Sequence, residues 1–95
     1  MKKIKVTCLA LAFVMLSQLI AFAAVTMKQY SKVKMGMTYS EVVQILGEPD
    51  QELSRTELSG YTTVMYMWEG NSLGGNMNAM FQNGKLVNKA QFGLK

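Results

Sequence analysis

Residues 37–49 read MTYSEVVQILGEP, and this stretch marks one helix with both a start and a stop. Thr38 and Glu41 have the spacing of a capping box, in which the cap side chain and the third helical residue satisfy each other's free backbone N–H groups. Gly47 stands where a left-handed C-cap belongs, and the proline two residues later prevents the helix from resuming. We therefore predict a helix over 39–46 with its apolar residues on one face.

The residues before this helix carry the same start signal. Thr26 and Gln29 repeat the capping spacing, which predicts a first helix over 27–33. Gly36 follows it and can adopt the positive φ of a tight turn. Two short helices therefore come first in the fold.

After the second helix the pattern changes to strands. Residues 61–68 read YTTVMYMW and are rich in aromatic and β-branched residues, which predicts a central strand. Residues 51–58 form a weaker candidate strand, joined to it through Ser59 and Gly60. The central strand is expected to be the most buried.

A second hairpin is predicted at the C-terminal end. Asn83-Gly84 suits a two-residue type I′ turn and separates strands at 76–82 and 85–92. The predicted fold is α+β, with two short N-terminal helices packed on one face of a three- to four-stranded antiparallel sheet. The turn also sets an expected register: Phe81 with Leu86, Ala79 with Asn88 and Met77 with Ala90 on the core face, and Met80 with Val87 and Asn78 with Lys89 on the other.

Strand alternation divides the apolar residues between the two faces. If Val64, Tyr66 and Trp68 face the helices, the opposite face has no further segment to cover it, and an apolar face of that kind typically binds a partner. If Tyr66 and Trp68 point outward instead, the outer face is aromatic, and Met65, Met67 and Met80 belong to the core. Methionine also fills gaps in small cores, which is the role expected for Met27, Met37 and Met77. The predicted recognition surface consists of Tyr61, Met65, Met67, Met80 and Val87, with Asn78, Lys89 and Gln91 as its polar border.

The first 23 residues have the pattern of a secretory signal peptide. Three lysines open the chain, an unbroken apolar run covers 8–16, and Ala21 and Ala23 form a small-x-small cleavage site. The alternative is an uncleaved anchor, because roughly 20 apolar residues could span a bilayer. We expect cleavage after Ala23, which leaves 24–95 as a single exported domain without stable membrane insertion.

Removal of this leader changes the charge. The chain has ten Lys and Arg against six Asp and Glu, and three of the bases lie in the leader, so the remainder carries 7 − 6 = +1. A nucleic-acid-binding domain would keep a basic stripe in its folded part, so nucleic acid is not an expected partner. The single cysteine, Cys8, also lies in the leader, and the predicted domain can form no internal disulfide.

The residue types that carry most enzyme chemistry are missing. The sequence has no histidine, and without Cys8 it has no thiol, so the usual catalytic triads and zinc sites are not available. Glu48, Asp50 and Glu52 lack the spacing of a calcium loop and are expected to be a solvated turn. Gly70 and Gly75 have the spacing of a phosphate loop but lack its lysine and helix, so we predict a flexible loop between strands. No enzyme activity, metal or cofactor is expected.

Two stretches resemble a known superfamily. The residues YSKVKMGMTYSEVVQILGEP (30–49) resemble the opening of modules in the β-lactamase-inhibitor-protein-like superfamily, and NMNAMFQNGKLVNKAQFGL (76–94) resembles an exported single-module domain of unknown function within it. A more distant resemblance is to the BamE/SmpA/OmlA-type domain of outer-membrane assembly. The resemblance implies helices before an antiparallel sheet and a function in protein binding.

These observations predict an exported, non-catalytic protein-binding module, inhibitor-like in style. Its expected partner is an unidentified protein outside the cytoplasm, whether periplasmic, at the cell surface or secreted. The alternative is an envelope assembly or structural accessory subunit similar to the BamE-type domain. The sequence leaves the partner and the oligomeric state open.

Overall fold

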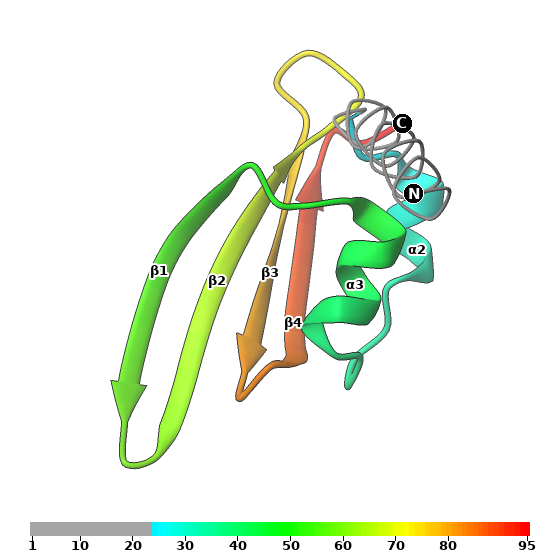
Figure 1. The fold of residues 1–95 in the computed structure, drawn as a ribbon. Coiled ribbons are helices and arrows are strands. Elements are labelled where there is room, and N and C mark those ends of the chain that lie inside the picture. The colour runs from blue at the N-terminus through cyan, green and yellow to red at the C-terminus, as the bar shows by residue number, and fades with distance from the viewer. Residues whose placement is uncertain (1–23) are drawn as a thin grey trace, which may run out of the picture.

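The computed structural model describes residues 24–95, and the predicted leader lies outside this range. Two helices precede a four-stranded antiparallel sheet, which confirms the predicted α+β class (Figure 1). The elements are α2 (Met27–Lys32), α3 (Tyr39–Leu46), β1 (Gln51–Leu58), β2 (Tyr61–Glu69), β3 (Asn76–Gln82) and β4 (Lys85–Phe92).

Both helices begin with the predicted capping box. In α3, the Thr38 hydroxyl accepts a hydrogen bond from the Glu41 N–H at 3.2 Å, and the Glu41 carboxylate accepts one from the Thr38 N–H at 2.9 Å. Thr26 and Gln29 make the same reciprocal pair in α2. Each box satisfies two backbone donors that the first turn of a helix otherwise leaves free.

The sheet order is β1-β2-β3-β4, so every strand pairs with its neighbours in the chain. The Ser59-Gly60 turn joins β1 to β2, and the Asn83-Gly84 turn joins β3 to β4. All four turn residues have positive φ. That combination is typical of a type I′ turn, whose twist matches the twist of the flanking strands. The turns predicted at both places are confirmed.

The core lies between the helices and one face of the sheet. The orientation of β2 is the first of the two considered above: Trp68 is 1% exposed and Val64 is also buried. The Trp68 indole N–H donates to the Gly47 carbonyl at 2.9 Å, which joins β2 to the end of α3. Nine buried residues form one cluster, namely Val25, Val33, Val42, Leu46, Trp68, Met77, Ala79, Phe81 and Leu86.

Two of the three methionines assigned to the core take that place. Met77 is fully buried, and Met37 packs against the core. Met27 is 39% exposed, so its assignment was wrong. It stands at the first position of α2, a short helix with no buried residue of its own.

The predicted register of the second hairpin fails after its first pair. Phe81 pairs with Leu86 as expected, but Met80 pairs with Asn88, and Val87 is the extra residue of a β-bulge. A bulge shifts every later pair by one residue and exchanges the faces of the side chains. Beyond it, Ala79 pairs with Lys89, Asn78 with Ala90, Met77 with Gln91 and Asn76 with Phe92.

The helices cover the sheet unevenly. They lie toward β3 and β4, whereas β1 and the turn that joins it to β2 extend away from them (Figure 1). All residues of β1 are exposed, while β3 alternates between buried and half-buried residues. Residues 24–95 contain no helix that is long and apolar enough to cross a membrane.

Candidate functional site: the outer face of the sheet

The outer face is the side of the sheet that turns away from α2 and α3. Its centre is a pair of methionines on neighbouring strands, because Met65 of β2 lies directly opposite Met80 of β3. Met67 and Asn78 form the next pair on the same face. All four side chains are half-buried, although no helix or strand of residues 24–95 covers this face. They cover one another as cross-strand neighbours do.

At one end of this face, the β1–β2 turn carries two exposed apolar side chains. Tyr61 is 55% exposed and pairs with Leu58, which is 72% exposed. The sequence analysis included Tyr61 and missed Leu58. The Ser59-Gly60 turn could have identified it, because a two-residue turn places its flanking residues opposite each other on one face.

The bulge in β4 changes which residues reach the outer face. Val87 is 47% exposed, as expected for a member of the predicted surface. Ala90 and Phe92 pair with outer-face residues of β3, and Phe92 is 72% exposed. The sequence analysis missed Phe92 because the regular register places it on the other face.

The same shift removes Lys89 and Gln91 from the predicted border. Both pair with residues of the core face, Ala79 and Met77, so their placement on the outer face was wrong. The Lys89 Nζ donates to the Tyr30 carbonyl at 2.8 Å and lies 4.1 Å from the centre of the Tyr30 ring. Burial first, and then the charge of nearby Lys34, lower the pKa of Lys89. Lys89 therefore connects β4 to α2.

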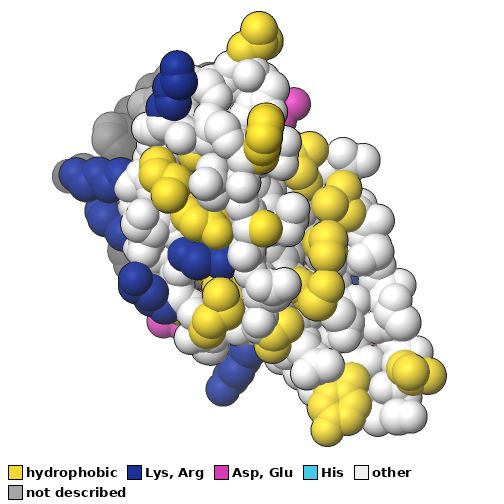
Figure 2. All heavy atoms as spheres, turned by 180° about the vertical axis from the view of Figure 1, so that it is seen from behind, with side chains coloured by type: hydrophobic (Ala, Val, Ile, Leu, Met, Phe, Trp, Pro, Cys, Tyr) yellow, Lys and Arg dark blue, Asp and Glu magenta, His cyan; other side chains and the backbone are white. Residues whose placement is uncertain are grey.

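Figure 2 shows the molecule from behind the sheet of Figure 1. Hydrophobic side chains run across this face down to the β1–β2 turn, basic side chains gather toward one side, and acidic side chains appear only at its margins. We define the outer patch by its apolar residues, which are Leu58, Tyr61, Met65, Met67, Met80, Val87 and Phe92. Asn78 remains its polar neighbour.

A shallow pocket adjoins the patch where β2 passes to β3. It has a volume of about 520 Å³ and is lined by Met67, Glu69 and the residues 70–76 except Asn71. The loop around it is held by hydrogen bonds from the Gly70 N–H to the Gly75 carbonyl at 2.8 Å and from the Ser72 hydroxyl to the Gly93 carbonyl. A Cβ at Gly70 would lie 2.8 Å from the carbonyl carbon of Gly75, which explains the glycine there.

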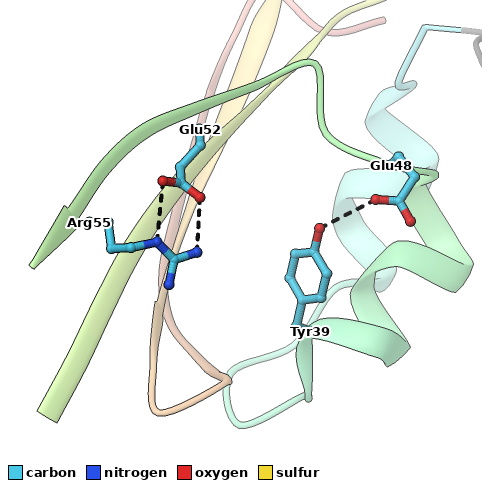
Figure 3. A network of polar contacts seen from close by, with 4 residues as sticks. All are labelled: Tyr39, Glu48, Glu52 and Arg55. Carbon is cyan, nitrogen blue, oxygen red and sulfur yellow. Dashed lines mark hydrogen bonds and ion pairs between the residues drawn. The ribbon is translucent and has the colours of Figure 1, made fainter. Parts of the chain in front are cut away.

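The face of the sheet that turns toward the helices carries a small group of polar side chains, which includes Glu48 and Glu52 (Figure 3). Glu52 and Arg55 form an exposed ion pair at 2.9 Å, and the Tyr39 hydroxyl donates to Glu48 at 3.4 Å. Burial, and secondarily the charge of Glu48, raise the pKa of Tyr39 to about 12. A tyrosine with a pKa near that value keeps its proton at neutral pH, so the Tyr39 hydroxyl is not a general base there.

Between residues 24 and 95, no group of three His, Cys, Asp or Glu side chains is placed to hold a metal. No buried polar or charged side chain occurs in this part of the chain. The outer patch can bind a partner through apolar contact and shape.

Comparison with known proteins identifies the family of this chain. The family model of the beta-lactamase inhibitor (BLIP) matches residues 26–95, which is nearly all of the described chain. The chain belongs to the BLIP family. The resemblance seen in the sequence is thereby confirmed, and no curated protein matches the chain significantly.

A solved structure agrees with this assignment. The crystal structure of a Streptococcus mutans protein, with the provisional name beta-lactamase inhibitor protein, is similar with a TM-score of 0.68 and 30% sequence identity. The match covers 77% of this BLIP-family chain and 47% of the Streptococcus mutans chain. This chain therefore corresponds to about half of that protein.

Proposed function

We propose that this BLIP-family chain is an exported, non-catalytic protein-binding module that recognises its partner through the outer patch. The observation that carries the proposal is an apolar sheet face that no helix or strand of residues 24–95 covers. Exposed apolar side chains that gather on one face of a domain often mark a binding surface.

The composition of the patch supports binding to a protein. Its centre consists of methionine side chains, which adapt their shape to a partner, and its end carries Tyr61, which offers a rigid apolar ring with a polar tip. Aromatic residues and methionine are enriched in protein interfaces, and charged residues are depleted at interface centres. Acidic side chains lie only at the margins of this face (Figure 2).

Export is the second part of the proposal. It rests on the leader pattern of residues 1–23. The partner then lies outside the cytoplasm. The matching family model is that of BLIP, so the envelope-assembly alternative gains no support from the comparisons.

The patch is tested by replacing its two central methionines with lysine. Met65→Lys and Met80→Lys together place two charges on directly opposed positions of β2 and β3. We expect the double variant to fold, because both side chains reach solvent, and to lose partner capture because burying unpaired charges in an interface is unfavourable. Capture from the exported fraction, compared with wild type by quantitative mass spectrometry, measures the loss.

A matched control adds the same charge elsewhere. Ser40→Lys and Gln44→Lys together introduce two lysines at exposed positions of α3, away from the outer patch. This control should capture the partner as wild type does. If the methionine variant folds normally and still captures the same protein, the outer patch is not the recognition surface.

The family match favours one partner class for direct measurement. Because the matching family is named for inhibition of β-lactamases, a β-lactamase is the first partner to test. Hydrolysis of a chromogenic cephalosporin by purified β-lactamases, with rising concentrations of this protein, would reveal inhibition. Inhibition that disappears in the Met65→Lys/Met80→Lys variant would identify both the partner class and the surface.

A further inference from the structure

We infer that two copies of this protein associate through strand β1, whose exposed edges pair antiparallel about a two-fold axis at Thr56. The inference concerns the edge of the sheet and does not rest on the proposed function of the outer patch. Four observations carry it: a free edge, the direction of its peptide groups, a short straight segment, and a symmetric pair of opposite charges.

The edge of β1 is free, whereas the start of β4, on the opposite edge of the sheet, is covered. There, the α2–α3 connection makes two backbone hydrogen bonds, from Gly36 N–H to Leu86 carbonyl and from Leu86 N–H to Met37 carbonyl, both at 2.8 Å. The first residue of α3 adds a third, from Tyr39 N–H to Gly84 carbonyl at 2.9 Å. No strand or loop of residues 24–95 pairs with the outer side of β1. An exposed edge of this length is a template for strand addition.

The peptide groups of Arg55 and Glu57 point outward from this edge. Thr62 of β2 accepts a hydrogen bond at its carbonyl from the Asn83 N–H at 2.8 Å, and its own N–H donates to the Asn83 side chain at 2.9 Å. Thr62 therefore directs its peptide groups away from β1, and its partner there, Glu57, directs its own away from β2. Arg55, two residues earlier, has the same orientation.

The straight part of the edge has a defined centre. The bulge at Leu53 interrupts β1 on one side, and the Ser59-Gly60 turn ends it on the other. The five residues between them run from Ser54 to Leu58, and the middle residue is Thr56. A bulge limits pairing along an edge, so Thr56 is the natural centre for an antiparallel pair of equal segments.

The charges beside Thr56 select a second copy as the partner. With Thr56 opposite Thr56 of the other copy, Arg55 lies opposite Glu57 twice, once on each side of the axis. A slip by two residues would instead place Arg55 opposite Arg55 or Glu57 opposite Glu57. Opposite charges across a strand pair are favourable and like charges are unfavourable, so the charges favour this register over a slip by two residues.

Both side chains are exposed, and Arg55 would share or exchange its present partner when it contacts Glu57 of the other copy. Arg55 is exposed and its present partner is Glu52, at 2.9 Å (Figure 3). Glu57 forms no ion pair within residues 24–95. The two-fold axis would run perpendicular to the sheet, so the outer patches of both copies would lie on the same side, with Leu58 and Tyr61 near the seam.

A charge-swap series tests the register. We expect the purified exported protein to show a concentration-dependent dimer by analytical ultracentrifugation. Arg55→Glu and Glu57→Arg alone should each weaken dimerisation about tenfold, because each creates two like-charge pairs. Mixing these two variants should restore dimers, and the double variant Arg55→Glu/Glu57→Arg should restore them in one chain.

A cysteine pair tests the position of the axis independently of affinity. In a Cys8→Ser background, Thr56→Cys should form a disulfide-linked dimer under mild oxidation, because opposed residues of a non-hydrogen-bonded pair have Cα atoms about 4.5 Å apart. Ser54→Cys is the control: its two copies would lie about 13 Å apart and should not cross-link.

Three results would overturn the inference. They are a monomer at all accessible concentrations, a dimer that the charge swaps leave unchanged, and equal cross-linking of the Thr56→Cys and Ser54→Cys variants. Circular dichroism of each variant checks that the fold is kept. A dimer that is lost only in Met65→Lys/Met80→Lys would show that the outer patch, not β1, joins the copies.

Discussion

Tyr39 shows how one side chain takes part in packing and electrostatics at once. Its ring lies 5.0 Å from that of Tyr66 and 5.5 Å from that of Phe81, and its hydroxyl reaches Glu48 at the end of α3. Ionisation would place a negative charge in this partly buried aromatic group beside a carboxylate. Burial, followed by the charge of Glu48, therefore raises the pKa of Tyr39 from 10.0 to about 12.

This shift predicts a loss of stability at high pH. Because the folded pKa lies above the unfolded one, the unfolded chain loses the Tyr39 proton first, and the contribution of this group falls as the pH rises from 10 to 12. Tyr39→Phe should remove that part of the pH dependence. Urea denaturation midpoints over this pH range measure it. Tyr61→Phe, on the other face, is the control, and parallel curves for wild type and Tyr39→Phe would contradict the prediction.

Lys89 illustrates how a residue's role depends on one neighbouring irregularity. In a regular hairpin it would border the outer face, but the bulge at Val87 turns it toward α2, where it contacts the Tyr30 carbonyl and ring. A cation over an aromatic ring and a hydrogen bond to a helix carbonyl both stabilise this position. Its function is therefore structural in this chain.

At the scale of elements, α3 is the best-specified part of the fold. Its cap, its length and its glycine end all follow from local signals, and Val42 and Leu46 supply its buried face. Thr38 also forms an isolated antiparallel bridge with Lys85 of β4. The residue that caps α3 therefore also contacts the edge strand of the sheet.

Thr38→Ala should lower the free energy of unfolding by about 1 kcal/mol, because it removes the side-chain acceptor of the Glu41 N–H. Chemical denaturation of wild type and variant measures this difference. Ser40→Ala is the matched control, since Ser40 lies in the first turn of α3 without being its cap. Equal midpoints for Thr38→Ala and wild type would show that the cap contributes nothing measurable.

At the scale of the whole molecule, residues 24–95 form one small core with a covered and an uncovered sheet face. A domain of this size buries only about 60% of its unfolded surface, so it has little stability in reserve. Its free surfaces, the outer patch and the β1 edge, are different parts of one sheet. The two proposals therefore place the partner and the second copy on separate parts of that sheet.

The exported form should begin at Ala24. Ala21 and Ala23 supply the small residues that signal peptidase requires after an apolar segment. N-terminal sequencing of protein recovered outside the cytoplasm checks the cleavage site, and Ala23→Leu should block cleavage there. Recovery of only a full-length, membrane-bound chain would contradict the signal-peptide prediction.

The sequence by itself determined the local structure of this protein. Capping boxes, glycine ends and two-residue turns act through backbone groups a few residues apart, so the bounds of α3, β1, β3 and β4 could be predicted directly. The orientation of β2 needed one further choice, which the burial of Trp68 decided. The family also followed from these local motifs and their order.

Only the tertiary structure decided which side chains share the outer face beyond Leu86. The bulge at Val87 lies where β4 meets the α2–α3 connection, which hydrogen-bonds to Leu86 on the side of β4 that faces away from β3. No signal within the hairpin specifies that contact, because its partners lie about 50 residues apart in the chain. One extra residue then exchanges the faces of Lys89, Gln91 and Phe92, since side chains along a strand alternate with a period of two.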